Sequence, residues 1–348
     1  MPRKNLGVSE EELFNLLQQG EDYALIRARL KYAEASQIIN HYIRKLQAGR
    51  IHPGMLPTQA TGRWSTTNPP VANIPKAYKT GPHSVIVPDP DERWFMFDWD
   101  AIEGKITAAF TRDKEDLDAF ALDHDLHVLT ACRAMGLPLP PVSTKAEIGK
   151  LPTGKGWKAQ VAWTEKVWKP RDLFKTIRYS LQNGIDEKAV LQAQIEFDEE
   201  TGKPVFDRDE LLRAGRLFLA SKRHTWGAWK DSVRAEVVST GKTRTALGRL
   251  GRFSGSPDQR LKEAVSLKVS GTVSDMMNIC LRDILDLFPG ARLCWNEHDG
   301  ATIAFPRNLD PTQAILKIIE RDWDITGVPI KSTATWEWIE APENQGGK

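Results

Sequence analysis

The sequence has few cysteines, no long apolar run and almost no net charge. Its three cysteines, Cys132, Cys280 and Cys294, are widely spread over 348 residues. They have neither the paired spacing of a zinc site nor the density of a disulfide-stabilised secreted domain. No stretch approaches the ~20 apolar residues that span a bilayer, and the N-terminus lacks the apolar segment of a secretory signal. We therefore expect a soluble protein that stays in the reducing cytosol of the cell that makes it.

The net charge of +2 conceals a strong segregation of charge along the chain. The stretch Val142–Arg178 holds nine basic and three acidic residues, and Arg213–Lys262 holds twelve and three. The rest of the chain has 27 basic and 40 acidic residues. Basic stretches of this kind attract a phosphate backbone, although ordinary solvated helix faces would give the same pattern.

Two carboxylates are predicted at the ends of strands. Trp94–Phe97 is an apolar run of strand character that ends at Asp98, and helical periodicity resumes at Ile102. Leu293–Phe305 has the pattern strand, turn, strand, with His298 and Asp299 in the turn. Phosphoryl transfer needs metal ions that activate a hydroxyl and neutralise phosphate charge, and Mg²⁺ prefers carboxylate oxygens. Alone, an aspartate in either position is more often a turn or helix-capping residue.

A predicted helix between the two aspartates carries Arg171, Lys175, Tyr179 and Asn183 at a constant spacing of four residues. Because a helix rises ~1.5 Å per residue, these side chains form a ladder ~18 Å long on one face. Arginine and lysine suit a triphosphate, and an aromatic ring suits the sugar and base. An amphipathic surface helix remains the alternative.

Six segments occur in an order that resembles one known family. They are Thr61-Gly62-Arg63-Trp64-Ser65 with Asn73-Ile74-Pro75, Asp98 to Glu103, Asp125-Leu126-His127 with Thr130-Ala131, Arg171 to Gly184, Ser270-Gly271-Thr272 with Asp275, and His298-Asp299-Gly300. Together they resemble the polymerase domain of family A DNA polymerases, the bacterial DNA polymerase I class, over roughly residues 55 to 340. The second, fourth and sixth segments resemble motifs A, B and C of that family.

The resemblance implies a role for each matching residue. Asp98 and Asp299 would be catalytic ligands of two Mg²⁺ ions, which Mn²⁺ can replace, with the backbone carbonyl of Trp99 as a further ligand. Glu103 would exclude ribonucleotides, so that the product is DNA. The incoming nucleotide would contact His127, Arg171, Lys175 and Tyr179, and DNA would contact Arg63, Asn73, Asn183, Ser270 and His298.

The sequence departs from the family pattern at several of these positions. Asn183 replaces a tyrosine of motif B, Ser270 replaces the glutamine of QGT, and Gly300 replaces the glutamate of motif C. Ala101 and Lys105 replace a glutamine and an arginine of motif A. Each change removes or alters a polar group near DNA or metal, but both aspartates remain, so we expect a divergent and active enzyme.

The expected fold class is α+β, a right-hand polymerase with an antiparallel-sheet palm, helical fingers and a reduced thumb. We assign residues 1–52 to a vestigial thumb, 53–135 and 266–348 to the palm, and 136–265 to the fingers. Only about sixty residues precede the Thr61-Gly62-Arg63 segment, so we expect no proofreading exonuclease. A thumb, exonuclease or processivity function could come from a separate chain, as in a split or phage-type replication enzyme.

The predicted function is template-directed addition of dNTPs to the 3′ end of a primer on primer-template DNA. Three alternatives stay open, one of which is reverse transcription of an RNA template. A non-catalytic subunit of a replication complex would bind primer-template without extending it. A single-subunit RNA polymerase would incorporate ribonucleotides, which Glu103 and Tyr179 oppose.

Overall fold

The computed structural model describes residues 49–57, 59–73, 86–122, 124–136 and 208–341, with scattered residues between 28 and 44 and between 174 and 178. The chain divides into two compact units. One comprises residues 1–55, 66–86 and 195–208, and the other comprises 56–65, 87–194 and 209–348. The second unit contains residues 56–65, 98 to 103 and 270 to 300, and with them most of the predicted site residues.

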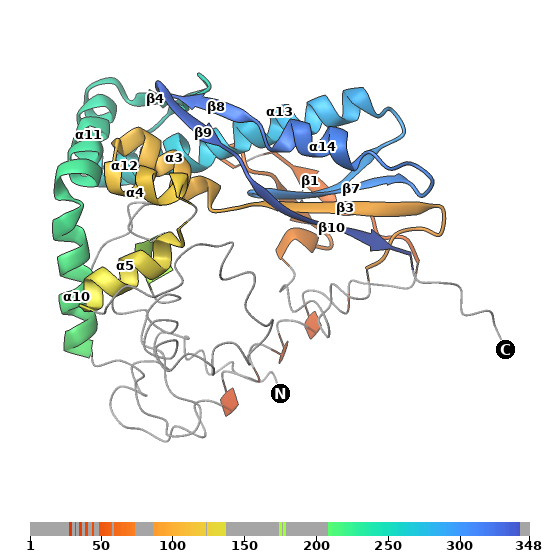
Figure 1. Cartoon of the computed structure of the whole chain (residues 1–348), viewed down its shortest axis with the longest axis horizontal. Coiled ribbons are helices and arrows are strands. Elements are labelled where there is room, and N and C mark those ends of the chain that lie inside the picture. Colours follow the sequence, from red (N-terminus) through yellow and green to blue (C-terminus); the bar gives the residue numbers. More distant parts are fainter. Residues whose placement is uncertain are drawn as a thin grey trace, which may run out of the picture. The chain divides into compact units, whose positions relative to one another are not determined.

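A four-stranded antiparallel sheet forms the centre of the second unit (Figure 1). Its strand order is β10-β3-β7-β6, with bounds Ala334–Glu340, Glu92–Trp99, Gly300–Pro306 and Arg292–Glu297. Side chains alternate between the two faces of a strand. Phe95, Phe97 and Trp99 of β3 accordingly all enter the main core. The predicted antiparallel sheet and the predicted α+β class are both confirmed.

Helices α13 (Thr272–Leu287) and α14 (Thr312–Ile319) lie on one side of this sheet (Figure 1). Met276, Cys280 and Ile284 on α13 recur at a spacing of four residues and are completely buried in the same core as the strand side chains. Phe95 contacts the rings of Trp336 and Trp338 at centroid distances of 5.5 and 5.1 Å. Aromatic contacts between neighbouring strands thus extend the core to the edge strand β10.

Helices α12, η5 and α13 follow one another without a break and cover residues 260–287, where the sequence pattern predicts helix. Ser256 caps α12 (Pro257–Ser266) by accepting a hydrogen bond from the Gln259 amide at 3.3 Å, and Pro257 occupies the first helical position. Five residues, Leu267–Gly271, have π-helical hydrogen bonding. Such π segments often occur at functional sites, and this one contains Ser270.

Three short helices follow β3 directly. They are α3 (Ile102–Thr111), α4 (Lys114–Ala121) and α5 (Leu126–Met135). Asp113 caps α4 and Asp125 caps α5, each by accepting hydrogen bonds from backbone amides of the first turn. These caps fix the residues at which α4 and α5 begin.

The remaining helices are α10 (Arg208–Ser221), the π segment η4 (Arg223–Gly227) and α11 (Ala228–Thr240). The remaining strand pairs are β4–β5 (Lys242–Arg244 with Leu250–Arg252) and β8–β9 (Asp322–Ile325 with Val328–Lys331). In the Pro-rich region after residue 53, β1 (Gly54–Leu56) and β2 (Ser65–Thr67) form a two-stranded sheet, and η2 covers Val71–Asn73. This region therefore has short regular elements that its composition did not predict.

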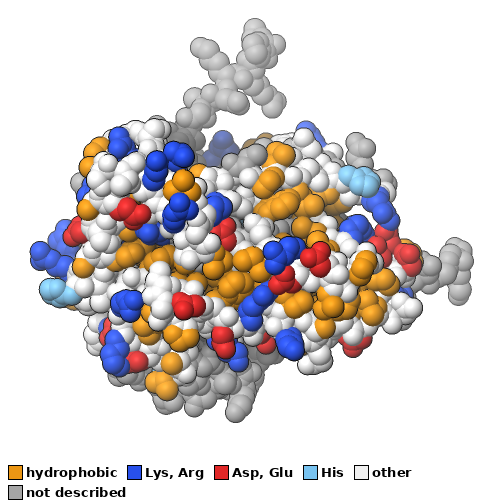
Figure 2. All heavy atoms as spheres, turned by 90° about the horizontal axis from the view of Figure 1, so that it is seen from above, with side chains coloured by type: hydrophobic (Ala, Val, Ile, Leu, Met, Phe, Trp, Pro, Cys, Tyr) orange, Lys and Arg blue, Asp and Glu red, His pale blue; other side chains and the backbone are white. Residues whose placement is uncertain are grey.

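Surface charge is mixed on the face shown in Figure 2, where Lys and Arg side chains lie among acidic and hydrophobic ones. Arg234, from the second basic stretch, is paired with Asp258 of α12 at 2.7 Å. Among the described helices, none is long and apolar enough to cross a membrane. All three cysteines are free thiols.

Candidate active site

Asp98 and Asp299 come together at one end of the central sheet. Asp98 is the penultimate residue of β3 and lies opposite Gly300 in the antiparallel register. The Trp99 amide donates a hydrogen bond to the carbonyl of Asp299 at 2.9 Å, and the Asp98 carboxylate is close enough to act electrostatically on the Asp299 carboxyl. The strand continues one residue beyond its predicted end because Trp99 is buried and its Nε1 donates to the Ile319 carbonyl at 2.8 Å.

Gly300 allows the two strands to approach this closely. A Cβ atom at position 300 would lie 2.5 Å from the Phe97 carbonyl and 3.1 Å from Oδ1 of Asp98. Contacts below 3.0 Å require a backbone shift, so a larger residue would push β7 away from Asp98. Gly300, which replaces the glutamate of motif C, therefore allows Asp98 and Asp299 to lie close together.

The Asp299 carboxyl is destabilised as an anion. Burial is the largest cause, followed by the nearby charges of Asp98 and Glu103, and together they raise its pKa to about 7. Two carboxylates that share a site resist simultaneous ionisation, and a divalent cation relieves that repulsion. The donor set thus fits a hard cation such as Mg²⁺, which prefers carboxylate oxygens.

A cavity of about 260 Å³ opens beside the two aspartates. Its walls include Trp99 and two residues predicted to bind the nucleotide, His127 and Lys175. His127 is buried in the first turn of α5, which Asp125 caps by accepting hydrogen bonds from the amides of His127 and Val128 at 2.9 and 3.0 Å. The cavity therefore combines acidic groups with cationic and polar ones.

A second group of predicted residues converges on Glu103. Arg63 forms an ion pair with Oε1 of Glu103, and the Ser270 hydroxyl donates to the same oxygen at 2.7 Å. The Glu103 side chain is 12% exposed. Because its charge also acts on Asp299, this group adjoins the aspartate pair. Three motifs far apart in sequence thus meet at one carboxylate.

Comparison with known proteins gives the same family that the motifs indicate. The family model for DNA polymerase family A matches residues 3–147. DNA polymerase I of Helicobacter pylori strain J99 is 24% identical over 352 residues, which is 95% of this chain and 35% of that protein. DNA polymerase I of Aquifex aeolicus is 24% identical over 80% of this chain and 42% of that protein. Over residues 3–147 the chain is similar to DNA polymerase family A.

The fold agrees with this relationship. A solved structure of the POL domain of Pol1 from M. smegmatis, in complex with DNA primer-template and dNTP, superimposes with a TM-score of 0.68 at 18% identity. The match covers 94% of this chain and 55% of that chain. The family A polymerase domain is therefore the fold of this chain, which spans only about a third of the length of the H. pylori relative.

The other predicted site residues are distributed as follows. His298 is exposed in the β6–β7 turn with a φ of 42°, and Asn73 ends η2 in the other compact unit. Arg171, Tyr179 and Asn183 lie outside the described residues. Of the ladder that resembles motif B, Lys175 is the one position described.

Arg249 is a structural centre of the site that the sequence did not reveal. Its Nε donates to Oδ1 of Asp275 at 2.5 Å, and its Nη2 donates to the carbonyls of Thr61 and Gly271 at 2.6 and 3.0 Å. At Gly62, where φ is +74°, a Cβ would lie 2.9 Å from the guanidinium carbon. Arg249 thus holds the segment before Arg63 against the one that contains Ser270.

Three further carboxylates, Asp113, Glu115 and Asp116, also converge in the described part of the chain, with ligand atoms within 4.8 Å of one another. The Lys222 ammonium already lies among them, 2.8 to 3.0 Å from the nearest oxygen of each. Burial would lower the pKa of Lys222, but the charges of Asp116 and Asp113 outweigh it and raise that pKa. A lysine that stays charged thus occupies the position that a metal ion would take among these three carboxylates.

Proposed function

We propose that this chain is a template-directed DNA polymerase that adds dNTPs to a primer 3′ end by two-metal-ion nucleotidyl transfer. The juxtaposition of Asp98 and Asp299 beside a cavity that also contains Lys175 carries the proposal. Phosphoryl transfer requires mainly positioning and electrostatic stabilisation, and this arrangement offers groups for both. Such a polymerase acts where DNA and dNTPs are present, which for a bacterial or phage enzyme is the cytoplasm.

The carboxylates of Asp98 and Asp299, with the backbone carbonyl of Trp99, would hold two Mg²⁺ ions. Bound metal supplies a lower pKa for the primer hydroxyl and charge neutralisation on the leaving phosphate. The protein's own contribution is to hold the two aspartates together through the β3–β7 register and the close approach at Gly300.

Nucleotide binding would use the cationic and polar side of the cavity. Lys175 and His127 would contact the triphosphate, together with Arg171, and Tyr179 would stack on the nucleotide. Glu103 would exclude a ribose 2′-hydroxyl, and its contacts with Arg63 and Ser270 support a fixed position for this carboxylate. A fixed side chain discriminates better than one that can move aside.

DNA contacts would come from Arg63, Asn73, Asn183, Ser270 and His298. In the described conformation Arg63 is paired with Glu103. Arg63 would contact the minor groove of the DNA while its guanidinium stays close to Glu103. We assign the sheet to the palm, residues 136–265 to the fingers and residues 1–52 to a reduced thumb.

Primer extension with either dNTPs or rNTPs tests this function. The parent should extend with dNTPs and Mg²⁺, and Asp98→Asn should lower kcat by about 10³-fold, which is several kcal/mol of transition-state stabilisation. Glu103→Ala should admit rNTPs. Asp118→Asn, an exposed aspartate of α4 paired with Lys114, is the matched control and should remain active.

Each alternative function gives a different result in the same assay. A parent that binds primer-template but extends nothing with Mg²⁺ or Mn²⁺ is a non-catalytic subunit. A parent that prefers rNTPs is an RNA polymerase. Equal activity in Asp98→Asn and the parent would refute the metal assignment, and an unchanged sugar preference in Glu103→Ala would refute the proposed gate.

A further inference from the structure

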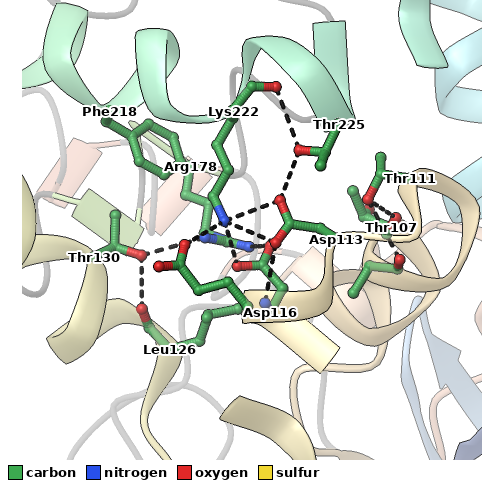
Figure 3. A network of polar contacts seen from close by, with 12 residues as sticks. Thr107, Thr111, Asp113, Asp116, Leu126, Thr130, Arg178, Phe218, Lys222 and Thr225 are labelled. Carbon is green, nitrogen blue, oxygen red and sulfur yellow. Dashed lines mark hydrogen bonds and ion pairs between the residues drawn. The ribbon is translucent and has the colours of Figure 1, made fainter. Parts of the chain in front are cut away.

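The helical residues around Lys175 are joined to helices α4 and α5 through a buried arginine (Figure 3). Arg178 forms an ion pair with Oδ2 of Asp116, and its Nη1 donates to the Thr130 hydroxyl at 3.2 Å. The two side chains of the ion pair are 2% and 1% exposed. The guanidinium also lies over the ring of Trp226 at 4.8 Å. Arg178 is thus held from several directions.

Lys175 and Arg178 lie on the same short stretch of helix but face different surroundings. Phe174, Ile177 and Arg178 are buried, with the spacing of three and four residues that marks one face of a helix. Lys175 is exposed and lines the cavity beside Asp98 and Asp299. One residue along a helix corresponds to a rotation of ~100°, so the buried face determines where Lys175 points.

The acceptor for Arg178 is itself fixed by a second cation. Oδ1 of Asp116 accepts a hydrogen bond from Lys222 at 2.8 Å, while Oδ2 forms the ion pair with Arg178. Lys222 also donates to Oδ2 of Asp113 at 3.0 Å, and the Thr225 hydroxyl donates to the same oxygen at 2.7 Å (Figure 3). Asp116 therefore cannot rotate away without breaking the pairing of Lys222.

We propose that Arg178 is a positioning residue: its ion pair with Asp116 and its hydrogen bond to Thr130 orient Lys175 toward the triphosphate of the incoming nucleotide. The proposal rests on the proposed function. An apolar side chain could fill the same volume without burying charge, and buried ion pairs often add little to stability. The planar guanidinium fixes the orientation of the helical residues 174–178, because its donors bind partners on two different helices at once.

Steady-state kinetics of single-nucleotide addition test the proposal with Arg178→Met. We expect the KM for dNTP to rise about tenfold and kcat to change less than about threefold, because ground-state binding of the triphosphate is what weakens. The Kd for primer-template should stay unchanged. Arg178→Lys keeps the charge but loses the planar guanidinium that donates to two partners at once. The KM of Arg178→Lys for dNTP should therefore lie between those of the parent and Arg178→Met.

The pair is tested by a double-mutant cycle. The fold-increase in the KM for dNTP in Arg178→Met/Asp116→Asn should be well below the product of the fold-increases in the two single variants. Either single change already breaks the same ion pair. Multiplicative effects would overturn the proposal. Arg133→Met is the matched control. Arg133 pairs with Glu115 of the same cluster, but its side chain is 51% exposed. The KM of Arg133→Met for dNTP should therefore equal that of the parent.

Hydrogen–deuterium exchange separates this proposal from the proposed function. A peptide that covers residues 174–178 should exchange faster in Arg178→Met than in the parent, at a temperature where both are folded. If the parent extends no primer, the proposed function fails, while faster exchange still supports the anchoring role. Unchanged exchange would mean that Arg178 does not anchor these residues, and a fall in kcat at constant KM would mean that it does not act on triphosphate binding. Either result would overturn the proposal.

Discussion

Asp299→Asn should stabilise the protein in the absence of metal, although it removes a residue that we place at the centre of catalysis. Burial and the charges of Asp98 and Glu103 raise the Asp299 pKa from 3.8 to about 7. At ~1.36 kcal/mol per pKa unit, about three units correspond to ~4 kcal/mol of destabilisation when the carboxyl is ionised. Asparagine removes the charge but remains buried, so we expect a gain of about 1–2 kcal/mol, or roughly 2–6 °C in Tm.

The pH dependence of this gain follows from the direction of the pKa shift. Below about pH 4, Asp299 is protonated in both the folded and the unfolded chain, and the parent pays no penalty. Between pH 4 and 7 the unfolded chain loses its proton while the folded one keeps it, so the stability of the parent falls. Above pH 7 the loss is constant. The advantage of Asp299→Asn should therefore be largest at pH 8 and small at pH 4.5.

Thermal unfolding in EDTA at pH 8 and pH 4.5 measures this difference. Adding Mg²⁺ at pH 8 should raise the Tm of the parent and leave that of Asp299→Asn unchanged, because only the parent binds the ion. Asp258→Asn, an 86% exposed aspartate, is the control and should change little. An Asp299→Asn protein that melts at or below the parent temperature at pH 8 would refute the repulsion between the aspartates.

Three further predictions concern the same end of the sheet. The apparent Mg²⁺ affinity should be about tenfold lower at pH 6 than at pH 8, since the ion must displace a proton from Asp299; a flat profile by titration calorimetry would contradict this. Gly300→Ala should lower kcat more than tenfold and stability by about 1–3 kcal/mol, whereas Gly290→Ala, with its nearest contact at 3.7 Å, should be silent in both assays. Phe95→Ala should cost about 3–5 kcal/mol in urea unfolding, and a cost below 1 kcal/mol would show that the core of the sheet is described wrongly.

The elements of the sheet could be predicted because their signals are local. The apolar run before Asp98 and the turn at His298 and Asp299 each mark a strand boundary within a few residues. The long helical pattern after Arg260 also appears as helix. What local patterns miss is the five-residue π segment at Leu267–Gly271, because its hydrogen bonding depends on packing against the rest of the chain.

The charge pairing could not be predicted from the sequence. Arg178 and Arg249 belong to the two basic stretches that we expected at a surface facing phosphates, yet Arg178 is buried against Asp116 and Arg249 is bound to Asp275. A charged side chain is buried only if a partner from elsewhere in the chain meets it, and no periodicity encodes that partner. A basic stretch therefore indicates the number of cations, while the fold decides which of them face solvent.

Manganese binding followed by electron paramagnetic resonance tests the central claim most directly, because it detects the ions without requiring turnover. With primer-template and a non-hydrolysable dNTP analogue, the parent should bind two Mn²⁺ per chain, and Asp98→Asn/Asp299→Asn should bind none at the same free concentration. Equal binding by the two proteins would mean that these aspartates do not hold the metal ions.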